Sequence, residues 1–152
     1  MPWWQITTCR IKMEKAISSG FQFTGFFIEE SHFKISSGSV KNLDINLEIN
    51  IGPEGVHYVK DKKFILTLNV DIKDHNGAFE CQITSRGEFN MVGDDEIISD
   101  YFYVNAPAIM FPYIRAYIST LTNLSTAGHS ITLPTLRIDL KETLKSKIQI
   151  VD

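Results

Sequence analysis

Two stretches of strictly alternating residues restrict the fold of this chain more than any other feature. In residues 43–51 every second residue is Leu or Ile, and Asp, Asn and Glu fill the positions between. In residues 64–72 Phe, Leu, Leu, Val and Ile stand at every second position, and Ile65, Thr67, Asn69 and Asp71 fill the positions between. Successive side chains on a strand point to opposite faces, so each stretch predicts a strand with one apolar and one wet face. Such strands are typical of an antiparallel sheet that is covered on one side only.

A further strand is predicted before this pair, beginning at Phe21. Phe21 and Phe23 share one face, and Phe26 and Ile28 continue on the opposite parity after Gly25. A glycine at such a slip predicts a β-bulge.

A fourth strand is predicted over residues 79–91. The preceding residues 74–77 are Asp-His-Asn-Gly, and Asn-Gly between alternating runs indicates a hairpin because both residues tolerate the positive φ of a tight turn. We expect a turn at residues 52–55, which are Gly-Pro-Glu-Gly, and a break in the fourth strand near Arg86-Gly87.

Helices are predicted after Gly93. The acidic residues 94–96 are expected to open one helix, and Pro107 a second, because a proline in the first turn loses no hydrogen bond. A broad apolar face is expected on the second helix, with Pro112 kinking it. That face consists of Ile109, Tyr113, Tyr117 and Leu121 at spacing four, flanked by Met110, Ile114 and Ile118.

A last amphipathic helix is predicted from about Ile138, with Leu140, Leu144 and Ile148 at spacing four. Strands first and helices after predict an α+β domain: a four-stranded antiparallel sheet with C-terminal helices packed on one face. We expect residues 21–152 to form this domain and residues 1–20 to form an N-terminal extension that is either mobile or a short extra element.

Composition excludes several classes of protein. The 152 residues, 43% of them hydrophobic, suit one domain, and a net charge of −3 argues against binding nucleic acid. Cys9 and Cys81 show no metal or redox spacing, so both are expected to be reduced and apolar in role. The sequence shows neither a secretory signal nor an apolar run that approaches the ~20 residues of a membrane span, so a cytoplasmic protein is expected.

The sequence lacks the common phosphate-binding, catalytic and metal-binding motifs. It contains no Gly-rich phosphate loop, no HExxH, no GxSxG and no Cys/His metal pattern. We therefore expect no catalytic residues, no cofactor and no metal site.

The helical half carries two motifs that point to a family. Phe111-Pro112-Tyr113-x-Arg115 follows Pro107, and Ile131-Thr132-Leu133-Pro134 follows Gly128. These residues resemble the helical half of SecB, a family of bacterial export chaperones, in which a helix that opens at a proline carries Phe-Pro-Tyr-x-Arg and an apolar loop holds Leu-x-Leu-Pro. The similarity extends back to Phe21 and forward to near Leu144.

The resemblance implies an ATP-independent holdase that binds unfolded polypeptides, preproteins for Sec-dependent export above all. It also implies dimers with an eight-stranded sheet, paired into a homotetramer. Ile131 and Leu133 are the favoured groove residues, because a glycine-flanked loop does not force apolar side chains inside. The other reading of each groove residue is ordinary core or subunit interface. The client-binding groove carried over from the family consists of Leu43, Ile45, Tyr113, Tyr117, Ile131 and Leu133.

The family's partner face is the outer face of the sheet, where the SecA motor docks on acidic residues. Glu30, Glu80 and Gln82 are the residues carried over to it. Only Glu30 matches an acidic position, since Lys34 and Gln82 stand where acids are expected and Glu80 where an apolar residue is expected. Two alternatives to export therefore stay open: a SecB-like chaperone dedicated to an antitoxin or another specific client, and a small-ligand-binding α+β domain.

Overall fold

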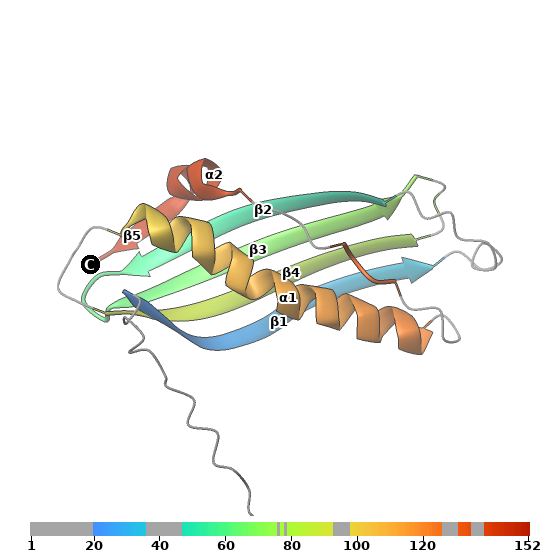
Figure 1. The fold of residues 1–152 in the computed structure, drawn as a ribbon, viewed down its shortest axis with the longest axis horizontal. Helices are drawn as coiled ribbons and strands as arrows, with labels where there is room; N and C mark the ends of the chain where they lie inside the picture. Colours follow the sequence, from blue (N-terminus) through green and yellow to red (C-terminus); the bar gives the residue numbers. More distant parts are fainter. Residues whose placement is uncertain are drawn as a thin grey trace, which may run out of the picture.

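The computed structural model of the chain describes residues 20–35, 47–75, 77, 79–92, 98–125, 131–134 and 139–152. In these residues one sheet is covered on one face by helix α1, which crosses it obliquely, and by the short helix α2 (Figure 1). The elements are β1 (Phe21–Ile35), β2 (Leu47–Tyr58), β3 (Lys63–Asp74), β4 (Phe79–Met91), α1 (Asp100–Ser125), α2 (Lys141–Ser146) and β5 (Ile148–Val151).

The sheet has the strand order β1-β4-β3-β2-β5. The first four strands pair antiparallel, as predicted, but β5 pairs parallel to β2, so the sheet is five-stranded and mixed. The prediction of a four-stranded sheet was wrong because the last expected helix stops at Ser146. Residues 148–151, Ile-Gln-Ile-Val, are rich in β-branched side chains that favour a strand, and the free edge of β2 pairs with them.

Two predicted interruptions are absent from the strands. β2 runs straight through residues 52–55, and the turn lies at residues 59–62; β4 likewise continues through Arg86-Gly87. Gly55 and Gly87 are both buried, and each gives room to a large neighbour. These glycines therefore serve close packing rather than chain reversal.

The bulge predicted at Gly25 is confirmed. The register of β1 against β4 shifts between Phe23 and Gly25, and it shifts again between Ile28 and Glu30. The second bulge, which the sequence analysis missed, returns Phe33 and Ile35 to the core-facing side.

Helix α1 is one continuous helix, not two. Asp100 lies in its first turn, Pro107 and Pro112 lie inside it, and the acidic residues 94–96 lie outside the described residues. Each proline deprives one carbonyl of its helical partner. A fully buried stripe at spacing four holds the helix on the sheet despite this loss; its members are Phe102, Ala106, Met110, Ile114, Ile118 and Thr122.

The apolar face of the sheet provides the other half of the core. All five alternating residues of β3 predicted to face inward, from Phe64 to Ile72, are buried. Phe102 anchors the start of α1 because its ring packs edge-on against Phe64 at 4.7 Å, Phe21 at 4.9 Å and Phe89 at 5.3 Å between centroids. Edge-to-face pairs at such distances add to the stability from buried area.

The contact between Gly87 and Met110 yields a first prediction. A Cβ atom at Gly87 would lie 2.5 Å from Sδ of Met110, so Gly87→Ala should lower the free energy of unfolding by about 1–3 kcal/mol. Gly52→Ala is the matched control, because no atom lies within 4 Å of a Cβ there. Denaturant unfolding of both variants checks this, and equal stabilities would contradict it.

The buried His57 yields a second prediction. Burial lowers the pKa of His57 below its usual 6.5, because the imidazolium is poorly solvated in the fold. The unfolded chain therefore binds the proton first as the pH falls, and stability should decrease from about pH 6.5 towards pH 5. His57→Leu should flatten this decrease in unfolding measured against pH. An identical slope in both chains would contradict it.

Candidate client-binding site

A second stripe at spacing four runs along α1 beside the buried one. It consists of Tyr101, Asn105, Ile109, Tyr113, Tyr117 and Leu121. Tyr101 and Tyr113 are exposed, Tyr113 by 48%, and the other four residues are half-buried. This stripe contains the apolar face that the sequence predicted, but it borders solvent, whereas its flanking residues Met110, Ile114 and Ile118 form the core.

Strand β1 supplies the opposite wall of this surface. Phe26 stacks on Tyr113 with the ring centroids 5.1 Å apart, and Phe23 lies 5.5 Å from the same ring. The hydroxyl groups of Ser31 and Tyr117 share a hydrogen bond of 2.7 Å. We name the surface formed by these residues of β1 and the stripe of α1 the β1–α1 groove.

The groove opens into a hollow towards the start of α1. This hollow has a volume of about 690 Å³. Its lining comes from both walls and comprises Phe21, Gln22, Phe23, Thr24, Tyr101, Asn105 and Ile109. Asn105 Nδ2 donates a hydrogen bond to the carbonyl of Tyr101 at 2.7 Å, which fixes the Asn105 side chain in this lining.

β1 also forms an edge of the sheet. It is 15 residues long, and no strand of the described part of the chain lies on its outer side. A sheet edge beside apolar side chains can accept an extended peptide through backbone hydrogen bonds, with alternate side chains in the groove.

The predicted groove residues separate into three groups. Tyr113 and Tyr117 lie in the β1–α1 groove, and Leu43 and Ile45 lie outside the described residues. Ile131 is buried and Leu133 fully so. The expectation that the loop leaves these two side chains outside therefore fails, and within one chain they belong to the core.

Hydrogen bonds from α1 explain why the loop turns inward. Arg115 Nε donates to the carbonyl of Leu133 at 3.0 Å, and the backbone N–H of Ile131 donates to Thr122 Oγ1 at 2.7 Å. Ser119 Oγ donates to the carbonyl of Ile131 at 3.3 Å. Once the backbone is fastened to α1, alternate side chains point into the core and leave Thr132 and Pro134 exposed.

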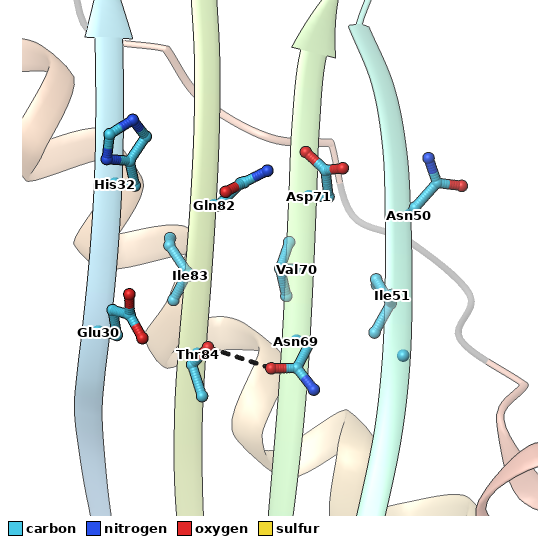
Figure 2. Close-up of a pocket in the computed structure, with 11 residues that line it drawn as sticks. Glu30, His32, Asn50, Ile51, Asn69, Val70, Asp71, Gln82, Ile83 and Thr84 are labelled. Carbon is cyan, nitrogen blue, oxygen red and sulfur yellow. Dashed lines mark hydrogen bonds between the residues drawn. The ribbon is translucent and has the colours of Figure 1, made fainter.

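The outer face of the sheet holds a polar hollow of about 590 Å³ (Figure 2). Glu30 and Gln82 belong to it, with His32, Asn50, Asn69, Asp71 and Thr84 around them. Thr84 Oγ1 donates to Asn69 Oδ1 at 3.1 Å. Glu80 lies further along β4, where the register places it between Lys34 and Lys73, so the three predicted partner-face residues do not form one acidic patch.

Among the described residues no group of three His, Cys, Asp or Glu side chains could hold a metal ion. Cys81 is buried, and burial together with the charge of Asp71 raises the pKa of its thiol to about 11, so it stays protonated and unreactive. No helix in the described ranges has the length and apolar character to cross a membrane.

Thr122 yields a prediction about the loop. Thr122→Val keeps the shape of the side chain but removes the acceptor for the buried N–H of Ile131, which should cost about 1–3 kcal/mol of unfolding free energy. Ser119→Ala is the control, since its bond is longer and only partly buried. Chemical denaturation should rank Thr122→Val clearly below Ser119→Ala; the reverse order would contradict this account of the loop.

No model of a protein family matches the chain. A relative in sequence is the uncharacterized protein MJ0357 of Methanocaldococcus jannaschii, 26% identical over 117 residues, which are 72% of this chain and 75% of that protein.

A solved structure shares the fold. It is the SecB-like chaperone Rv1957 of Mycobacterium tuberculosis, solved in complex with a ChAD peptide from the Rv1956 HigA1 antitoxin. The two superpose with a TM-score of 0.62 and 14% sequence identity over 76% of this chain and 87% of that chain. The chain therefore has the α+β fold of this SecB-like chaperone.

Proposed function

We propose that this protein is a SecB-like, ATP-independent chaperone that holds extended, unfolded polypeptide in the β1–α1 groove. The observation that carries the proposal is the exposed aromatic surface of Tyr113, Phe23 and Phe26 beside an edge strand. Burial of this surface would stabilise a complex by roughly 25 cal/mol per Å² without demanding one client sequence. Backbone hydrogen bonds would add affinity for an extended chain wherever the edge of β1 is not paired with a second subunit.

The client class that we favour is a dedicated partner such as an antitoxin, bound through an apolar extended segment. Two observations support this choice over Sec-dependent export. The chaperone that shares the fold was solved with an antitoxin peptide. In the described residues Glu80 also lies between Lys34 and Lys73, so the three residues carried over from the family do not make one acidic patch for a SecA-like motor.

Preprotein export is the second candidate function. It is favoured by the Phe111-Pro112-Tyr113-x-Arg115 motif and by Glu30 and Gln82, which share one hollow on the outer face. A pull-down with SecA separates the two: specific capture that is lost in Glu30→Lys would support export, and no capture would support the dedicated client.

Self-association belongs to the same proposal. Val104 and Leu124 of α1 are exposed apolar side chains, and the described residues place no strand on the outer side of β1, so we propose a homotetramer, built as a dimer of dimers in the cytoplasm. Light scattering of the full chain tests this, and a monomer at micromolar concentration would favour the small-ligand alternative.

A matched pair of aromatic substitutions tests holdase activity. Tyr113 and Phe27 are about equally exposed, at 48% and 52%. Phe27 lies on β1 but lines a small hollow with Glu29, Arg86 and Glu88 on the polar face of the sheet, away from the groove. Tyr113→Ser should weaken binding of a reduced, unfolded client about 5- to 30-fold, as expected for an aromatic anchor worth 1–2 kcal/mol, whereas Phe27→Ser should not.

The readouts are suppression of client aggregation and the Kd from anisotropy titration, with circular dichroism as a check on folding. Equal loss in both variants would reject the groove as the binding surface. No suppression by the unmodified chain, even at stoichiometric concentration, would reject the chaperone function itself.

A further inference from the structure

The outer edges of β1 and β2 differ in whether another strand covers them. On the outer side of β1 the described residues place no strand, whereas the edge of β2 is covered by β5. The pairing runs from Gly55 opposite Ile148 to Tyr58 opposite Val151. Backbone hydrogen bonds close both ends of the pairing: Gly55 N donates to the carbonyl of Lys147 at 3.2 Å, and Val59 N to that of Val151 at 3.0 Å.

Pro53 removes a hydrogen-bond donor from the part of the β2 edge next to β5. The N–H groups of Gly55 and Val59 both point towards β5. Because backbone groups alternate between the two sides of a strand, the odd-numbered residues of β2 face this edge. Pro53 is one of them, and it has no N–H to offer an incoming strand.

Helix α2 fastens β5 to the rest of the fold. Leu144 is fully buried, and its Cδ1 would lie 3.4 Å from a Cβ on Gly55. Asp100, at the start of α1, pairs with Lys141 at 3.4 Å and with Lys145. The ammonium of Lys145 also lies 5.6 Å from the ring centroid of Tyr103. One buried side chain and a cluster of exposed charges therefore hold the segment at this edge.

We propose that residues 139–152 form an edge guard that closes β2 against a second copy of this chain. With both edges open, β1 of one copy could pair with β2 of the next. That contact joins two different surfaces, so it can repeat from copy to copy and grow into larger rings or open filaments instead of stopping at two subunits. With β2 covered, only contacts between two like edges remain, and these close at two subunits. A four-residue strand is itself a poor template for further pairing.

The partner that the guard excludes is a second copy because the chain presents the complementary surface itself. β1 offers 15 residues of edge, enough to pair with the whole of the 12-residue β2. The proposal does not depend on client binding, so it can fail or hold independently of the proposed function.

Two single substitutions to proline in β5, tested in the full chain, form a matched pair. The odd-numbered residues Lys147 and Val151 bond to β2, so by alternation the amide of Gln149 faces β2 and that of Ile150 faces away. Gln149→Pro should detach the guard, and Ile150→Pro should leave the pairing in place. Amide hydrogen exchange at Gly55 and Val59 should accelerate about tenfold or more in Gln149→Pro only.

Sedimentation velocity over a range of protein concentrations then gives the decisive result. Gln149→Pro should form species that grow with concentration beyond the size of the unmodified chain, and Ile150→Pro should keep the unmodified size. Accelerated exchange at Gly55 and Val59 without any change in size would overturn the proposal.

A second variant covers the case in which Gln149→Pro does not fold. Lys141→Gln/Lys145→Gln removes only the exposed charges that pair with Asp100, and it should show the same two changes at smaller amplitude. If this variant exchanges faster at Gly55 and Val59 but keeps the unmodified size, or matches the unmodified chain in both measurements, the guard is an integral part of the fold and the proposal is wrong.

Discussion

The packing of α1 on the one apolar face of the sheet determines where the other side chains of this fold can lie. Six residues at spacing four, from Phe102 to Thr122, are buried against that face. The next stripe, one residue earlier at each turn, cannot reach the same depth. It therefore meets β1 at the border of the core, where Tyr113 stacks on Phe26 and stays half open to solvent. The β1–α1 groove is thus a consequence of how the core is filled.

The same packing gives a physical role to the motif around Phe111. Phe111 is buried, Tyr113 lies in the groove, and Arg115 bonds the carbonyl of Leu133 in the downstream loop. Three neighbouring residues thus contribute to the core, to the β1–α1 groove and to the attachment of the loop. The two motifs that carry the resemblance to SecB are joined by a hydrogen bond in this fold.

Much of the architecture could be predicted from the sequence, because residues 64–72 alternate strictly and because a slip in parity at Gly25 marks a bulge. The failures have a common cause in tertiary context. Gly-Pro-Glu-Gly at residues 52–55 has the composition of a turn, yet it lies in a strand because Pro53 faces an edge and Gly55 packs against Phe64. Ile148 fits a helical spacing but joins a strand because β2 provides a partner.

The candidate site was only partly predictable for similar reasons. Tyr113 and Tyr117 follow from periodicity along the helix, and the same spacing extended backwards would have indicated Tyr101. Phe23 and Phe26 could not be placed opposite Tyr113 without the path of α1 across the sheet. Ile131 and Leu133 are buried because three polar side chains of α1 bind their backbone, and no local pattern shows this.

In the proposed function a client occupies the border between β1 and α1. Nuclear magnetic resonance of the aromatic side chains during titration with an unfolded client tests it most directly. The account predicts that the rings of Tyr113 and Phe26 shift in proportion to bound client while the ring of Phe27 on the opposite face does not. Shifts confined to Phe27 and its neighbours, with Tyr113 unchanged, would contradict it.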